Sequence, residues 1–145
     1  MFDAQLNLAL SMARDSGPKP GVIIVDLNRL KLINDMHGHR VGDEALIALA
    51  SKLRKSVEPD CVVARIGGDE FGVVLPGNCN ALSLGRLRAN FKSGMGCTIA
   101  ATGKPIFVSA SVGVAVFPED GATVSELLTS ADKSMYAQKR SLSVA

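Results

Sequence analysis

The sequence predicts a mixed α/β fold of the α+β type, in which a mixed central β-sheet is flanked by helices. Three observations support it. Apolar residues recur at helical spacing near both ends of the chain. Two β-prone runs, Cys61–Val63 and Val73–Leu75, flank a Gly-Gly turn and predict a hairpin. A third apolar run, at 22–27, is separated from the hairpin by two helical patterns and therefore needs a crossover connection.

The first half of the chain predicts a helix, a strand and two further helices. A Gly- and Pro-rich segment at 16–21 ends the first helix, and the continuous run Val22–Leu27 predicts a buried central strand. A short helix through Leu30 and Ile33 should stop at Gly38, and Asp43 is expected to cap the next helix. The apolar stripes of the two longer helices are Phe2, Leu6, Ala9, Leu10 and Ala13, and Ala45, Leu46, Leu49, Ala50 and Leu53.

After the hairpin, the sequence predicts a helix, a strand and a final helix. The helix covers 81–91 and is weakened by Gly85, and the strand at 107–117 alternates with Val108, Ala110, Val112, Val114 and Val116 on one face. Thr123 and Glu126 form a capping box that opens the last helix, which buries Leu127, Leu128, Ala131 and Met135. This order is the arrangement of a polymerase palm or a nucleotide cyclase, an analogy of fold that proves no function.

The composition indicates one globular domain and excludes several functions. The 145 residues suit a single compact domain, and 47% apolar content argues against disorder. A net charge of +2 with only 4% aromatic residues predicts neither nucleic-acid binding nor membrane contact. Three scattered cysteines predict reduced thiols in a cytoplasmic setting, without a disulfide framework or a zinc site.

Three acidic residues carry the candidate chemistry. Asp26 ends the first predicted strand, and Asp69 and Glu70 lie in the hairpin turn beside Gly67-Gly68. If that strand pairs beside the hairpin, the three carboxylates meet at one edge of the sheet. Carboxylates next to bare backbone suit Mg²⁺ and the phosphates that complete its coordination shell. The plainer alternative is a solvated turn with surface acids, since Asp and Gly are common in turns.

Four blocks of the sequence resemble the GGDEF family of diguanylate cyclases. They are Asp26–Asp43, Arg65–Phe71, Ser111–Ala115 and Ala131–Lys139, in the family's order and spacing over nearly the whole chain. The resemblance implies an enzyme that joins two GTP molecules into cyclic di-GMP and releases two pyrophosphates. It also implies that a homodimer is needed, since each subunit brings one GTP.

The resemblance assigns roles to the acidic centre. Asp26, Asp69 and the Leu27 carbonyl would bind Mg²⁺, or Mn²⁺ in its place. Asp69 or Glu70 would deprotonate or orient the 3′-hydroxyl, and the sequence does not choose between them. Gly67 and Gly68 would leave the backbone open to the substrate.

The resemblance also assigns roles in binding the nucleotide. Asn34 and Asp43 would read guanine, since a carboxylate accepts from its N–H groups and an amide donates to its acceptors. Lys31 and Lys139 would lie near the phosphates, and the backbone N–H groups of Asn28–Leu30, at the expected start of a helix, would cradle the phosphate tail. Taken singly, Lys31 reads as a solvated helix charge, Asn34 as a helix-end polar residue and Asp43 as an N-cap.

The sequence departs from the family pattern at several places. Asn28 stands where the family often has Asp, and Leu30 where it often has Phe. Glu58 and Cys61 occupy the register of the family's Arg-x-x-Asp site, so we expect no product inhibition there. The usual leading element and the terminal Gly-Arg-Asn are missing. Residues 1–145 are therefore expected to be one GGDEF domain excised from a larger, cytoplasmic or membrane-anchored signalling protein. A GTP-binding regulatory domain controlling an attached phosphodiesterase or other output module stays the alternative.

Overall fold

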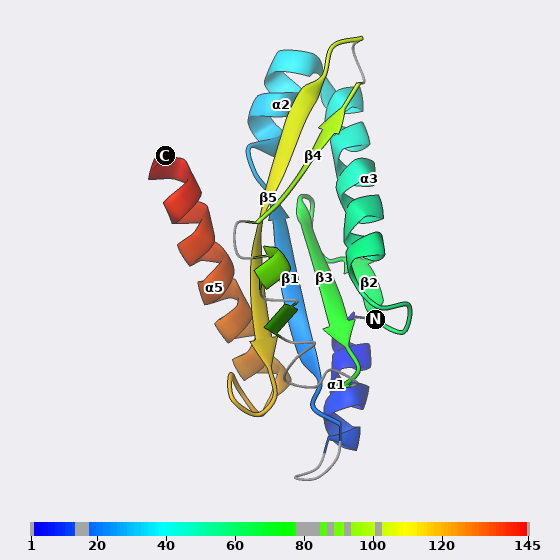
Figure 1. Cartoon of the computed structure of the whole chain (residues 1–145), viewed down its shortest axis with the longest axis vertical. Helices are drawn as coiled ribbons and strands as arrows, with labels where there is room; N and C mark the ends of the chain where they lie inside the picture. The colour runs from blue at the N-terminus through cyan, green and yellow to red at the C-terminus, as the bar shows by residue number, and fades with distance from the viewer. Residues whose placement is uncertain are drawn as a thin grey trace.

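The computed structural model describes residues 2–13, 18–77, 85–86, 89–91, 94–100 and 103–144, and it confirms the predicted fold class. A five-stranded sheet is flanked by helices (Figure 1). In chain order the elements are α1 (Phe2–Met12), β1 (Gly21–Leu27), α2 (Leu30–His37), α3 (His39–Ser56), β2 (Val62–Arg65), β3 (Glu70–Leu75), β4 (Met95–Ile99), β5 (Ile106–Val116) and α5 (Val124–Val144).

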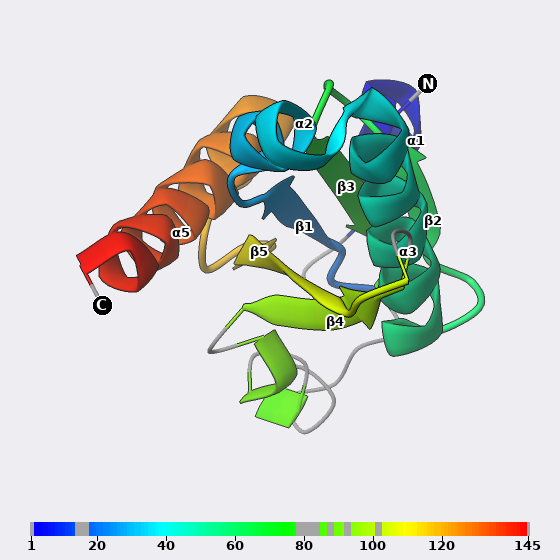
Figure 2. The same ribbon diagram turned by 90° about the horizontal axis from the view of Figure 1, so that it is seen from above.

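The strand order is β2-β3-β1-β5-β4, so β1 is central, as predicted. Figure 2 shows the strands between α5 on one side and α3 on the other. All four pairs of neighbouring strands are antiparallel, which corrects the expectation of a mixed sheet with both parallel and antiparallel pairs. The reason is that the crossover through α2 and α3 makes β1 and β2 parallel, but β3 lies between them.

Two apolar cores hold β1 in place, one on each face of the sheet. One core contains residues of α3 and the other contains residues of α1 and α5. The predicted face of β5 lies in the first core, which confirms its alternation; its members are Val108, Ala110, Val112, Val114 and Val116. Burying one large apolar side chain stabilises by about 1.5–3 kcal/mol, far more than a surface ion pair. Packing on both faces therefore fixes the end of β1, where Asp26 lies.

The α2–α3 junction differs from the prediction in one respect. α2 ends at Gly38, as expected, and the positive φ of 93° at that residue favours glycine. α3 then begins at once at His39, so the expectation that Asp43 caps its start is wrong. Because Gly38 reverses the chain by itself, no capping residue is needed, and Asp43 lies one turn inside α3. The stripe of α3 is buried as predicted, except that Ala50 is only half-buried.

β4 was missed because its sequence lacks a strand pattern. Gly96 interrupts it and Thr98 is exposed, and only its ladder with β5 defines it as an edge strand. The helix predicted at 81–91 lies largely outside the described residues, and the described parts at 85–86 and 89–91 are helical.

The start of α5 confirms the capping box. The Glu126 N–H donates to Thr123 Oγ1 at 3.1 Å, and the Thr123 hydroxyl donates to Glu126 Oε1 at 3.3 Å. Leu127, Ala131 and Met135 are fully buried against the sheet. Across the described ranges, no helix is both long and apolar enough to cross a membrane.

Candidate active site

Pairing of β1 with β3 brings the three acidic residues to one end of the sheet. Asp26 lies opposite Glu70 in the register, and the Leu27 N–H donates to the Asp69 carbonyl at 2.8 Å. The central strand and the hairpin turn are thereby joined directly at the acids. The condition set by the sequence, that the first strand pairs beside the hairpin, is met.

Arg65 holds the Gly-Gly turn from the side. Its Nε donates to the Gly67 carbonyl at 3.1 Å and its Nη2 to the Gly68 carbonyl at 2.5 Å. Both glycines are exposed, and a Cβ on Gly68 would meet nothing within 4 Å. The turn is therefore fixed but open to a ligand. Sequence reasoning missed this role, although a guanidinium two residues before a Gly-Gly turn is a signal that can be read.

Asp26 is a buried carboxylate with one committed and one free oxygen. The residue is only 7% exposed. Its Oδ2 accepts from Lys139 Nζ at 2.8 Å, whereas no described residue donates to its buried Oδ1. Burial raises the pKa of Asp26, the nearby Asp69 raises it further, and Lys139 opposes the shift. Burying a carboxylate costs desolvation free energy, and a bound cation would compensate for the lost water.

Glu70 and Asp132 form a second acidic pair, between β3 and α5. Burial raises the pKa of Glu70, and the charge of Asp132 is the next cause. Burial also raises the pKa of Asp132. Both residues border a hollow of about 540 Å³ between α1, α5 and the hairpin. Sequence reasoning did not single out Asp132, because an acid on an amphipathic helix reads as a solvated face.

The donor set fits a magnesium or manganese ion that also binds phosphate. The free Oδ1 of Asp26 is the observation that supports the fit. Where the chain is described, no three His, Cys, Asp or Glu side chains form a complete metal cage. Mg²⁺ does not require one, since it uses one or two carboxylates and fills its shell with water and substrate phosphates.

Asn28 is held to β5, and its backbone N–H, which was expected to contact the phosphates, instead donates to the Ser109 carbonyl at 2.8 Å. Its Nδ2 donates to Ser109 Oγ at 3.2 Å, and the fully buried Ser111 hydroxyl donates to its Oδ1 at 2.9 Å. Both polar ends of the Asn28 amide are therefore paired. Serine suits both of these positions, since a hydroxyl can donate to an amide oxygen and accept from an amide N–H.

The remaining predicted residues lie on α2 and α3. Asn34 is half-buried, with an Oδ1 that is shielded from solvent and that no described group contacts by a hydrogen bond. Asp43 is exposed and borders a hollow of about 390 Å³ with Arg65 and Phe71. Leu30 is half-buried at the first position of α2, and Lys31 is exposed beside it.

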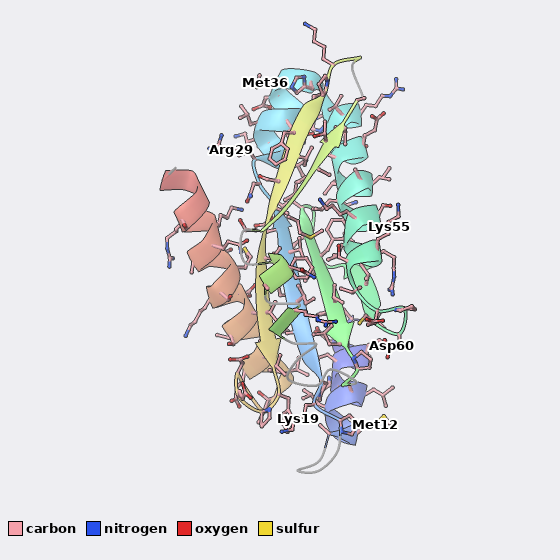
Figure 3. All side chains as sticks on the ribbon, in the orientation of Figure 1. Met12, Lys19, Arg29, Met36, Lys55 and Asp60 are labelled. Carbon is pink, nitrogen blue, oxygen red and sulfur yellow. The ribbon has the colours of Figure 1, made fainter. Side chains whose placement is uncertain are left out.

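A larger hollow of about 620 Å³ lies between α2, β4 and β5. Figure 3 shows Arg29 at the start and Met36 near the end of α2, and both border this hollow. Lys139 also borders it, so this lysine lies between the hollow and Asp26. Arg29 has a positive φ of 59°, a backbone conformation that costs energy in a residue other than glycine.

The comparisons with known proteins cover nearly the whole chain. A family model described as diguanylate cyclase, GGDEF domain, matches residues 1–143. The diguanylate cyclase TpbB of Pseudomonas aeruginosa is 34% identical over 140 residues, which are 96% of this chain and 32% of TpbB. The chain thus spans about a third of the length of this curated relative.

Two solved structures show the same fold. The crystal structure of the GGDEF domain of TpbB is 32% identical with a TM-score of 0.84, covering 97% of this chain and 88% of that one. The GGDEF domain of DgcB from Caulobacter crescentus, solved in complex with c-di-GMP, is 27% identical with a TM-score of 0.75. That match covers 97% of this chain and 83% of the other.

Proposed function

The chain belongs to the GGDEF domain family of diguanylate cyclases, and from this premise we propose that it condenses two GTP molecules into cyclic di-GMP with release of two pyrophosphates. The observation that carries the proposal is the buried Asp26, which lies across the β1–β3 ladder from Glu70 and beside Asp69. A solvated turn would not explain a buried acid with a free oxygen at this position.

Asp26, Asp69 and the Leu27 carbonyl are the groups that would hold Mg²⁺ or Mn²⁺. When bound, the ion supplies charge neutralisation at the α-phosphate. Asp26 keeps its free Oδ1 for this purpose, while its Oδ2 is paired with Lys139. The Lys139 ammonium can move from Asp26 to the substrate phosphates, since 35% of the lysine side-chain surface is exposed.

The nucleotide is recognised at the α2–α3 pair and at the turn. Asp43 accepts from the guanine N1–H and 2-amino groups, and Asn34 donates to a guanine acceptor. Lys31 and the backbone N–H of Leu30, at the start of α2, bind the phosphates. The exposed Gly67-Gly68 backbone admits the substrate next to the acids.

The condensation joins the substrates of two chains. The 3′-oxygen of each GTP forms a bond to the α-phosphorus of the other, and the bond from that phosphorus to the bridging oxygen of pyrophosphate breaks. The hydroxyl proton passes to Asp69 or Glu70. The raised pKa of Glu70 makes it a stronger base than an exposed glutamate. Each chain supplies half of this arrangement, so catalysis requires a homodimer.

The setting of the domain is also part of the proposal. We infer that residues 1–145 form one GGDEF domain of a larger, multidomain protein, because the chain spans only 32% of TpbB. Such a domain acts on the cytoplasmic side, where GTP and reduced thiols are found.

A binding experiment tests the proposal. Calorimetric titration of the chain with GTP and Mg²⁺ should show saturable binding, and ATP should bind at least tenfold more weakly. Asp43→Ala should remove this discrimination. Absence of GTP binding would contradict the proposal, and equal binding of GTP and ATP would contradict the guanine-reading roles.

The alternative is a GTP-binding regulatory domain without turnover, controlling an attached output module. One observation favours it: Asn28 is tied to Ser109 and Ser111 and adds no charge to the acidic centre. It predicts GTP binding without cyclic di-GMP, even when two chains are joined.

A further inference from the structure

Gly42 lies where α3 packs directly against Leu30 and Asn34 of α2. It is buried and is the fourth residue of α3. A Cβ built on it would overlap the Asn34 Oδ1 and would lie 3.0 Å from Asn34 Cγ and 3.3 Å from Leu30 Cδ1. The Asn34 carboxamide therefore occupies the space that a side chain at position 42 would fill.

The Asn34 carboxamide is held in an unfavourable environment. Its Oδ1 is buried, and within the described part of the chain no group donates a hydrogen bond to it. Leaving a buried acceptor unpaired costs about 1–3 kcal/mol, and asparagine is also a poor residue for a helix interior. Packing alone would favour an apolar residue at this position, which indicates that the carboxamide is kept for its other end, the Nδ2 donor.

The arrangement also decides which end of the amide is available. With Oδ1 held against Gly42, the Nδ2 end is the donor that remains. Asp43 follows Gly42 directly, so an acidic acceptor comes from the same turn of α3 that the Asn34 carboxamide contacts. Guanine presents two donors and a neighbouring acceptor on one edge, which this pair complements.

We propose that Gly42 is a positioning residue that orients Asn34, through its bare Cα, to donate to guanine. The inference rests on the proposed function, since it assigns how that same site selects its base. Gly42 itself touches no substrate. Any side chain there would displace the carboxamide and remove the selection of guanine over adenine.

A double-mutant cycle tests the proposal on the whole chain. Gly42→Ala should weaken GTP binding about tenfold, the loss of one good hydrogen bond, and should lower the ratio of GTP to ATP affinity by the same factor. In an Asn34→Ala background the same change should alter GTP affinity less than twofold, because the group being positioned is absent. Gly85→Ala is the matched control, since a Cβ there meets nothing within 4 Å.

Each outcome decides the matter. Equal losses in both backgrounds, or an unchanged affinity ratio in Gly42→Ala, would overturn the positioning role. If Gly42→Ala alone does not fold, Asn34→Leu keeps the shape without the polar atoms, and retained selection of GTP over ATP would refute the inference. Absence of GTP binding by the unaltered chain would instead refute the proposed function.

Discussion

Lys139 occupies the acidic site as a resident cation, and replacing it should expose the metal affinity of Asp26. Its Nζ lies 2.8 Å from Asp26 Oδ2. A divalent ion on the free Oδ1 lies next to this ammonium and is repelled by it, and an ion that uses both oxygens must displace it. We therefore predict that Lys139→Met binds Mn²⁺ more tightly than the unaltered chain when nucleotide is absent, and that it binds GTP more weakly.

The size of the effect follows from the ion pair. A hydrogen bond between charged groups contributes about 1.5–3 kcal/mol when it is well shielded. Lys139 keeps 35% of its side-chain surface in solvent, which screens the interaction, so we take about 1.4 kcal/mol. That free energy corresponds to about a tenfold gain in metal affinity.

The assay is Mn²⁺ binding followed by electron paramagnetic resonance of the free ion at pH 7, without nucleotide. Lys133→Met is the control, because it removes the same charge from an exposed position on the same helix. Unchanged or weaker Mn²⁺ binding in Lys139→Met would refute the reasoning that this lysine competes with the metal. An equal gain in Lys133→Met would assign the effect to net charge alone.

Further predictions concern stability, the turn and the product. Because its pKa is raised on folding, the native Asp26 keeps its proton at pH values where the unfolded chain has lost it. The free energy of unfolding of the metal-free chain should therefore fall as pH rises above about 4. Asp26→Asn should lessen this fall and raise the melting temperature by a few degrees at pH 7. The same pH profile in Asp26→Asn as in the unaltered chain would contradict this prediction. Arg65→Ala should release the turn and lower turnover about tenfold, with GTP affinity changed less than threefold; a variant with full turnover would show that the anchor is dispensable. Titration with cyclic di-GMP should show no tight binding at Glu58 and Cys61. Tight binding that substitutions at these two residues abolish would contradict this prediction.

The acidic centre could be predicted from the sequence because its parts are local signals. A strand that ends in an acid and a Gly-Gly-Asp-Glu turn are each readable in a few residues. What was needed from three dimensions was the β1–β3 register, which places Asp26 opposite Glu70. Lys139 is 113 residues away from Asp26, and only packing of α5 on the sheet makes them partners.

Other features could not be read because their causes are tertiary. β4 has no alternation of its own and exists through its ladder with β5. The start of α3 was misplaced because Asp43 is a good capping residue in isolation, whereas Gly38 turns the chain without one. The contact between Gly42 and Asn34 depends on how closely two helices approach, and no sequence pattern reports that distance.

Product formation by joined chains tests the central claim most directly. The chain fused to a dimeric coiled coil is incubated with GTP and Mg²⁺, and the nucleotides are separated by chromatography. We predict cyclic di-GMP and two pyrophosphates for each product formed, and none from the Asp69→Ala dimer. A joined dimer that binds GTP and Mg²⁺ but forms no cyclic di-GMP would contradict the account.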